Sequence, residues 1–137
     1  MKLLFVCTGN SCRSQMAEGF ARHLASEPME AGSAGIESHG IDPRAVEIMA
    51  EIGVDISGQE SSILSDEMLE WADLVITLCS DADRNCPLLP PGTRKIHCPF
   101  PDPRKATGTA EEITAVYRSV RDEILLFVKD LIDYHLQ

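Results

Sequence analysis

Basic residues are scarce in this sequence compared with acidic ones. Its 137 residues include 12 Lys and Arg against 22 Asp and Glu, which gives a formal net charge of -10. Such a balance argues against nucleic acid or an anionic membrane surface as the partner. An anionic substrate would be repelled by the mean field of the molecule, so a local site would have to hold it.

Long hydrophobic runs and targeting signals are lacking too. No stretch approaches the roughly 18 apolar residues of a membrane span, and the apolar residues before Cys7 are too few for a signal-peptide core. We therefore expect a cytoplasmic protein with no membrane partner. The five cysteines are an odd number that cannot pair fully. In a reducing compartment they indicate thiol chemistry or burial rather than a disulfide framework.

Internal repeats and low-complexity tracts are missing as well. With 44% hydrophobic residues, the chain has the composition of an ordinary globular domain. Its length allows about 68% of the surface of the unfolded chain to be buried, and it requires no second core. We expect one domain over residues 1–137, present as a monomer.

One motif carries most of the chemistry: the run Cys7-Thr8-Gly9-Asn10-Ser11-Cys12-Arg13-Ser14. It follows an apolar stretch and precedes a helix-like pattern, which predicts a loop between a buried strand and a helix N-terminus. Backbone N–H groups and the helix dipole there favour a bound tetrahedral anion, and Arg13 can donate two hydrogen bonds to it. The same field stabilises a thiolate at Cys7, since a free thiol is only about 3% ionised at pH 7. The motif predicts an enzyme that attacks an oxyanion with sulfur, with residues 8–14 binding the substrate.

Individual side chains of this loop have more ordinary roles open to them. Ser14 is expected either to hydrogen-bond the Cys7 sulfur or to cap the helix. Asn10 is expected to hold the shape of the loop, in a positive-φ conformation. Cys12 is expected to be structural.

Strands and helices are predicted to alternate along the chain. Strands are predicted at 3–6, 29–35, 74–78 and 95–98. A first helix is predicted after the Cys7 loop, with Met16, Phe20 and Leu24 on one buried face. A second is predicted to begin at Asp42-Pro43 and to be capped by Gly53, and a third to cover residues 66–71. This order indicates an α/β fold, an open four-stranded parallel sheet with helices on both faces. In such sheets ligands bind beyond the carboxyl ends of the strands.

The last helix has the clearest signals. Thr109 and Glu112 fit a capping box at its start. An apolar stripe at helical spacing follows and is predicted to be core; it consists of Ile113, Val116, Tyr117, Val120, Ile124, Phe127, Val128, Leu131 and Ile132. Before this helix, Pro99, Pro101 and Pro103 are predicted to keep the chain extended and outside any helix.

Cys79 and Cys86 form a second group of thiols, beyond the strand at 74–78. In a helix they would share a face but lie about 10.5 Å apart along the axis, whereas a disulfide needs Cα atoms within roughly 7 Å. The segment is suited to melting, because Ser, Asp and Asn are mediocre helix formers and Pro87 prevents propagation. We therefore favour a redox pair over two buried small hydrophobes.

Asp102 stands between two prolines on a stiff segment. That backbone suits a general acid placed near a leaving oxygen, although Asp-Pro alone more often marks a turn. Cys98 is expected to be a buried strand residue, and a zinc site built on it lacks a close cysteine pair. We expect neither a metal nor another cofactor, since the histidines lack metal-ligand spacing and are expected at the surface or in the core: His23, His39, His97 and His135.

Taken together, these motifs resemble the thioredoxin-coupled arsenate reductases, which share the fold of the low-molecular-weight protein tyrosine phosphatases. The resemblance covers nearly the whole chain. It rests on residues 7–19, Ser33-Ala34-Gly35-Ile36, residues 78–83 with Cys86-Pro87, and Asp102-Pro103. The pair Cys79 and Cys86 is its most specific part.

The resemblance implies a relay of three thiols. Cys7 would attack the arsenic of arsenate, for which phosphate and sulfate are analogues, while Asp102 protonates the departing oxygen. Cys79 would then attack the Cys7 sulfur and expel arsenite. Cys86 would attack Cys79 in turn, loop out residues 80–85 and leave a disulfide for thioredoxin to reduce.

One family feature is not matched. Some relatives hold potassium through residues matching Asn10, Glu18, Ser33 and an acidic residue, but the fourth position is Ser62 here. We therefore do not expect potassium dependence.

Two other functions stay open on the sequence alone. Cys7, Arg13 and Asp102 suffice for a phosphatase acting on phosphotyrosine or small phosphoesters, although basic residues follow Asp102-Pro103 rather than the tyrosines typical of such enzymes. A thiol sensor or arsenite-binding module could use the later cysteines. It would leave Cys7 and Arg13 without a role.

Overall fold

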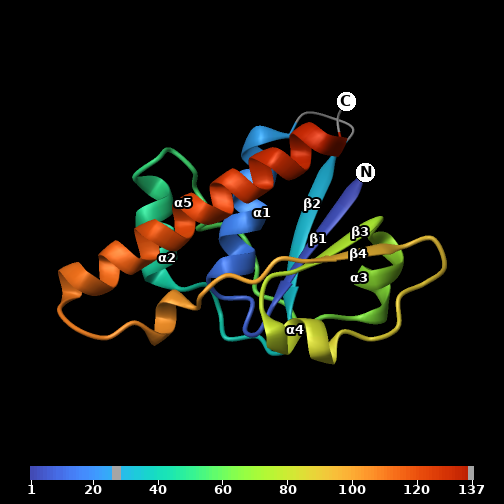
Figure 1. Cartoon of the computed structure of the whole chain (residues 1–137), viewed down its shortest axis with the longest axis horizontal. Helices are drawn as coiled ribbons and strands as arrows, with labels where there is room; N and C mark the ends of the chain where they lie inside the picture. Colours follow the sequence, from blue (N-terminus) through green and yellow to red (C-terminus); the bar gives the residue numbers. More distant parts are fainter. Residues whose placement is uncertain (26–28, 136–137) are drawn as a thin grey trace.

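The computed structural model describes residues 1–25 and 29–135 (Figure 1). Four parallel strands form one sheet in the order β2-β1-β3-β4. The strands are β1 (Lys2–Cys7), β2 (Glu30–Gly35), β3 (Leu74–Thr77) and β4 (Arg94–His97). The helices are α1 (Arg13–Leu24), α2 (Pro43–Ala50), α3 (Asp66–Trp71), α4 (Ser80–Asn85), the 3-10 helix η1 (Pro103–Lys105) and α5 (Ala110–His135). The predicted single α/β domain with four parallel strands is confirmed.

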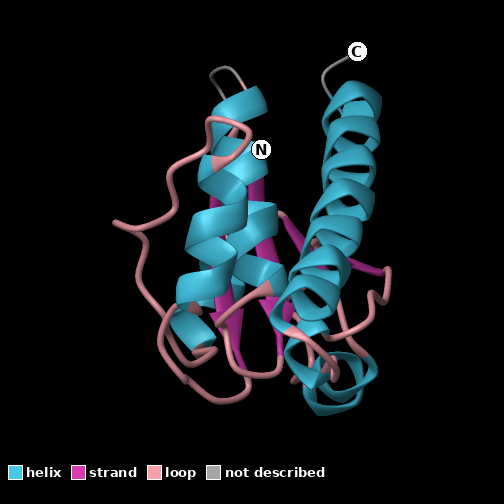
Figure 2. Cartoon of the chain, turned by 90° about the vertical axis from the view of Figure 1, so that its left-hand side faces the viewer, coloured by secondary structure: helices cyan, strands magenta, loops and turns pink. Residues whose placement is uncertain are grey.

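Helices cover both faces of the sheet, as predicted. On one face α1 packs against α5, and Figure 2 shows α5 running alongside the rest of the molecule. On the other face Trp71 of α3 lies against Gly32 of β2, next to Leu4 of the paired strand β1. Among the described residues, no helix is both long enough and apolar enough to cross a membrane.

Strand β1 is the centre of the sheet and of the core. It pairs with β2 on one side and β3 on the other, and its residues from Leu3 to Cys7 are all buried. A strand covered on both faces is a continuous apolar run, which explains Leu3-Leu4-Phe5-Val6. Because all strands are parallel, their carboxyl ends meet at one edge, where Cys7 pairs with Gly35 and α4 begins (Figure 1).

The helix boundaries follow local signals. Asp42 caps α2 by accepting a hydrogen bond from the Arg44 N–H at 3.0 Å, and Gly53 has a φ of 79° just past its end. At the start of α5 the capping box is formed, with Thr109 Oγ1 accepting from Glu112 N–H at 3.1 Å. These predictions are confirmed.

Packing differs from the prediction at the ends of two helices. Leu24 is 40% exposed, because positions spaced by four residues drift about 80° around a helix between Met16 and Leu24. Val116 is also exposed, and Ile113 and Phe127 are only half-buried. Arg121 is buried instead, with its guanidinium donating to Ile48 O at 2.9 Å. This contact orders the C-terminal end of α2 against α5.

Two predictions around β4 are wrong. Cys98 is half-buried and follows the strand rather than lying buried within it, because β4 is the edge of the sheet and most of its side chains are exposed. Pro103 starts η1 instead of staying outside any helix. The fixed φ of proline suits the first position of a helical turn, and Asp102 caps that turn by accepting from Arg104 N–H.

Candidate active site

The loop after β1 forms a cradle, which we define as residues 8–13. Asn10 adopts a φ of 47°, the left-handed conformation predicted for it. The end of β2 packs so tightly against this turn that a Cβ on Gly35 would lie 2.6 Å from Asn10 N. A glycine at the end of β2 is therefore needed for the cradle to close.

Cys7 lies at the base of the cradle with a hydroxyl directed at its sulfur. Its Sγ is 2.8 Å from Ser14 Oγ, and Asn10 Nδ2 donates to the same hydroxyl at 2.8 Å. Because Ser14 Oγ accepts from Asn10, its own proton is free to be donated to Cys7. Such a bond stabilises the nucleophilic thiolate form. Of the two roles predicted for Ser14, the hydrogen bond to Cys7 is the one formed. Both Asn10 and Ser14 are fully buried.

Arg13 and Asp102 meet at the mouth of the cradle. Arg13 Nη1 donates to Phe100 O at 3.1 Å, and its Nη2 lies 3.6 Å from Asp102 Oδ2. The Arg13 side chain is 8% exposed and that of Asp102 is 20% exposed. Together with Cys7 they line a cavity of about 80 Å³, whose other walls are Thr8, Gly9, Ser11, Cys12, His39 and Arg104. The cavity therefore combines a thiol, a guanidinium and a carboxyl group.

Cys79 lies next to the cradle, in contact with Thr8. It is buried, precedes α4, and its Sγ accepts a hydrogen bond from Ala82 N–H at 3.3 Å. The same sulfur lies 3.2 Å from Thr8 Oγ1 of the cradle. Thr8, Arg13 and Asp102 also line a neighbouring cavity of about 340 Å³ that contains Cys79. The structure thus places a second thiol beside the first one's binding loop.

Cys86 follows the other end of α4 and is half-buried. The six residues of α4 separate it from Cys79, so the helical spacing considered from the sequence is the one observed. All five cysteines are free thiols within the described part of the chain. Burial raises the pKa of Cys86 and of Cys98.

Cys12 differs from Cys7 although both belong to the cradle. Burial, with a further contribution from the Asp42 carboxylate, raises the pKa of the Cys12 thiol well above its ordinary value. Asp42 is itself fixed by a 2.6 Å hydrogen bond from Tyr117 Oη. A neutral Cys12 is consistent with the structural role expected for it.

His39 and Arg104 line the cavity over Cys7 and were not expected there. His39 Nε2 lies 2.7 Å from Glu37 Oε2, and Arg104 Nη1 lies 3.5 Å from His39 Nδ1. Since Arg104 can only donate, His39 Nδ1 is the acceptor of the second contact. Their positions in the sequence could have indicated this, because His39 comes after the carboxyl end of β2 and Arg104 comes two residues after Asp102. Ligands bind at the carboxyl ends of parallel strands.

The four positions considered for potassium lie together, and Asn10 links them to the cradle. Asn10 Nδ2 donates to Ser33 Oγ at 3.0 Å, Ser33 Oγ donates to Glu18 Oε1 at 2.5 Å, and Ser62 N–H donates to Asn10 Oδ1 at 2.7 Å. A guanidinium already neutralises this group, since Arg22 Nε donates to Glu18 Oε2 at 2.7 Å. Across residues 1–25 and 29–135, no group of three or more His, Cys, Asp or Glu side chains is arranged to hold a metal ion.

Known proteins share this sequence and fold. Residues 2–135 match the family of low molecular weight phosphotyrosine protein phosphatases. The chain is 52% identical over 122 residues to an arsenate reductase of Bacillus subtilis (strain 168), covering 89% of this chain and 88% of that protein.

Solved structures that share the fold include both phosphatases and arsenate reductases. An arsenate reductase in the phosphate binding state aligns with a TM-score of 0.74 and 36% identity, over 97% of both chains. A thioredoxin-dependent arsenate reductase of Corynebacterium glutamicum aligns with a TM-score of 0.75 and 28% identity, over 97% of this chain and 60% of that one. The resemblance inferred from the motifs is confirmed: this chain is an enzyme of the low molecular weight phosphotyrosine protein phosphatase family and groups with its arsenate reductases.

Proposed function

We propose that this protein is an arsenate reductase that converts arsenate to arsenite and is reduced again by thioredoxin. The observation that carries the proposal is the position of Cys79, whose sulfur lies 3.2 Å from Thr8 of the cradle. Hydrolysis of a phosphoester needs only one thiol, a guanidinium and a general acid. A second thiol next to the cradle is needed for a reduction, in which a disulfide forms as two electrons pass to the substrate.

In the proposed first step, arsenate occupies the cavity over Cys7. Backbone N–H groups at the start of α1 and the Arg13 guanidinium bind its oxygens. The Cys7 thiolate attacks arsenic, the As–O bond breaks, and Asp102 gives a proton to the departing oxygen. Arsenic is still As(V) in the resulting thiol-arsenate adduct.

Electrons move in the second step. The Cys79 thiolate attacks Cys7 Sγ, a Cys7–Cys79 disulfide forms, and the electron pair of the As–S bond stays on arsenic. Arsenite leaves as As(III). Thr8 Oγ1 and the Ala82 N–H both contact the Cys79 sulfur and can stabilise it as a thiolate.

A third step frees the cradle. Cys86 attacks Cys79, Cys7 leaves as a thiolate, and the disulfide moves to Cys79 and Cys86. Thioredoxin, a dithiol reductant, would reduce that disulfide by two further exchanges. The thioredoxin-dependent arsenate reductase described above has the same fold, which supports this choice of reductant.

Phosphatase activity is the second candidate. Cys7, Arg13 and Asp102 surround one small cavity, and phosphate has the shape and charge of arsenate. The family to which the chain belongs is that of the low molecular weight phosphotyrosine protein phosphatases. We propose that slow hydrolysis of small phosphoesters accompanies the reductase activity.

The proposed biological role is arsenic detoxification in the cytoplasm. Five free thiols suit a reducing compartment. All residues named in the relay come from one chain, so a monomer is sufficient.

The test is arsenate-dependent oxidation of NADPH in the presence of thioredoxin and thioredoxin reductase. Single replacements Cys7→Ser, Cys79→Ser and Cys86→Ser should each abolish steady-state turnover. Cys98→Ser is the matched control, since it removes a half-buried thiol with no role in the relay. Full turnover by Cys79→Ser would overturn the proposal and leave the phosphatase candidate.

A further inference from the structure

A cluster of polar side chains joins α4 to the last two strands; we call it the α4 clasp and define it as Thr77, Asp83, Lys95 and His97. Lys95 Nζ lies 2.9 Å from Asp83 Oδ1, and Thr77 Oγ1 donates to the same carboxylate oxygen at 3.2 Å. His97 Nδ1 lies 2.9 Å from Thr77 Oγ1 and 3.8 Å from Asp83 Oδ1. The clasp ties the middle of α4 to the sheet, and none of its members has a part in the relay proposed above.

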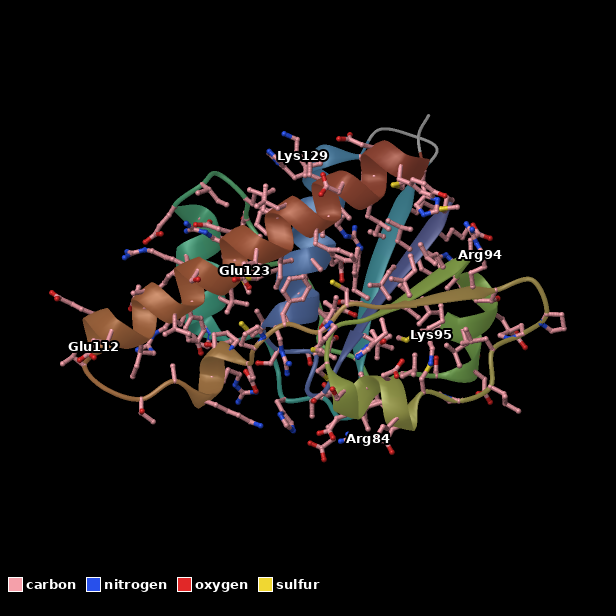
Figure 3. The ribbon with its side chains drawn as sticks, viewed as in Figure 1. Arg84, Arg94, Lys95, Glu112, Glu123 and Lys129 are labelled. Carbon is pink, nitrogen blue, oxygen red and sulfur yellow. The ribbon has the colours of Figure 1, made fainter. Side chains whose placement is uncertain are left out.

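Cys86 directly follows α4, the helix that carries Asp83, so the charges of the clasp bear on its thiol. Burial raises the pKa of the Cys86 thiol, the Lys95 ammonium opposes that rise, and the Asp83 carboxylate adds to it. Conversely, the neighbouring Asp83 raises the pKa of Lys95. Figure 3 shows Lys95 on β4, on the side toward α4, whereas Arg84 lies at the outer surface of that helix. In the reduced protein the Lys95 ammonium is therefore paired with Asp83, which weakens its stabilising effect on a Cys86 thiolate.

Disulfide formation must break this pairing. Cys79 and Cys86 flank α4, and seven helical steps separate them by about 10.5 Å, beyond the roughly 7 Å that a disulfide allows. Residues 80–85 must leave the helical conformation, and Asp83 moves with them. Lys95 does not move with them, because its backbone is paired with Val75 of β3. The ammonium then loses its carboxylate partner while Cys86 has to become a nucleophile.

We propose that Lys95 is a positioning residue for the third thiol exchange, and that Asp83 keeps its ammonium engaged until α4 unwinds. The inference deepens the proposed function and rests on it. In the step itself the Cys86 thiol gives its proton to solvent, the positive charge of Lys95 favours the resulting thiolate, and the thiolate attacks Cys79 Sγ. The Cys79–Cys86 bond forms, the Cys7–Cys79 bond breaks, and Cys7 leaves as a thiolate, so no further oxidant or reductant is required.

The test compares the two ends of one salt bridge. The pH dependence of Cys86 alkylation by iodoacetamide is followed by mass spectrometry in the fully reduced protein. Lys95→Met should slow alkylation of Cys86 at neutral pH roughly threefold, and Asp83→Asn should speed it by a similar factor, the size expected for one partly exposed charge. A merely structural salt bridge would move both variants in the same direction, since each loses the same contact.

Several controls make this comparison specific. Lys95→Arg keeps the positive charge and should stay close to wild type. Lys129→Met and Asp133→Asn make the same charge changes at exposed positions of α5, and Figure 3 shows Lys129 far from Lys95. Cys98 serves as an internal reference, and its alkylation rate should not change in any variant.

A second measurement addresses the exchange step directly. After one turnover with arsenate and no thioredoxin, Lys95→Met should accumulate the Cys7–Cys79 disulfide that wild type converts rapidly to Cys79–Cys86. Equal conversion rates, or alkylation shifts of the same sign in Lys95→Met and Asp83→Asn, would overturn the role of Lys95. Absence of any disulfide in wild type would overturn the relay instead. The alkylation comparison uses no arsenate, so the two failures are distinguishable.

Discussion

Replacing Ser14 by alanine removes the only hydroxyl that contacts the Cys7 sulfur among the described residues. Ser14 Oγ lies 2.8 Å from Cys7 Sγ and is oriented by Asn10 Nδ2, also at 2.8 Å. The side chain is fully buried, so water cannot easily take its place. The substitution should therefore weaken the thiolate and slow its attack on the substrate.

The magnitude follows from the kind of bond that is lost. A hydrogen bond to a charged group contributes about 1.5–3 kcal/mol, and each 1.4 kcal/mol is about a tenfold change in rate. We expect kcat/KM for arsenate to fall about 10- to 100-fold in Ser14→Ala. Stability should change by only about 1 kcal/mol, because Asn10 Nδ2 keeps its hydrogen bond to Ser33 Oγ.

The assay is the thioredoxin-coupled oxidation of NADPH at limiting arsenate, together with thermal unfolding of the same samples. Ser119→Ala, an exposed serine on α5, is the matched control and should behave as wild type. If Ser14→Ala unfolds like wild type and keeps its kcat/KM within about twofold, Ser14 does not stabilise the nucleophile and this reasoning fails.

Two further predictions concern stability. Hydrogen bonds and charge from Arg118, with help from Arg121, hold the pKa of Glu51 at about 2, below its ordinary value of 4.5. The contribution of Glu51 to stability is therefore complete above about pH 5 and is lost as the pH falls toward 2. The stability advantage of wild type over Glu51→Gln, measured by urea unfolding, should shrink over that pH range. A difference that stays constant with pH would contradict this prediction. Gly35→Ala should lower the unfolding midpoint and weaken phosphate binding, because its Cβ would lie 2.6 Å from Asn10 N. Gly58→Ala is the control and should be neutral, since no described residue would come within 4 Å of its Cβ. Equal behaviour of the two variants would be evidence against a rigid cradle.

The fold could be predicted because its elements carry local signals. Asp42-Pro43 starts α2, the capping box of Thr109 and Glu112 starts α5, and the apolar run from Leu74 forms a strand buried on both faces. Each signal acts within a few residues of the element that it defines. The burial of Arg121 could not be predicted in this way, because it depends on the hydrogen bond from its guanidinium to Ile48 O of α2.

The parts of the candidate site with local sequence signals could likewise be predicted, whereas contacts between distant segments could not. The cradle is contiguous in sequence, and Cys79 and Asp102 lie at strand ends, so the rule that ligands bind there predicted them. The contact between Thr8 and Cys79 joins loops 71 residues apart, and the clasp of Asp83 with Lys95 depends on how α4 lies on β4. No local pattern contains such information. It emerges only from the register of the strands and the packing of α4.

Single turnover with arsenate, without thioredoxin, tests the central claim most directly. The released arsenite is counted and the disulfide is located by peptide mass mapping. The account predicts one equivalent of arsenite per protein, a disulfide between Cys79 and Cys86, and a free Cys7. Arsenite release with Cys79 and Cys86 both still reduced, or no arsenite at all from fully reduced protein, would contradict it.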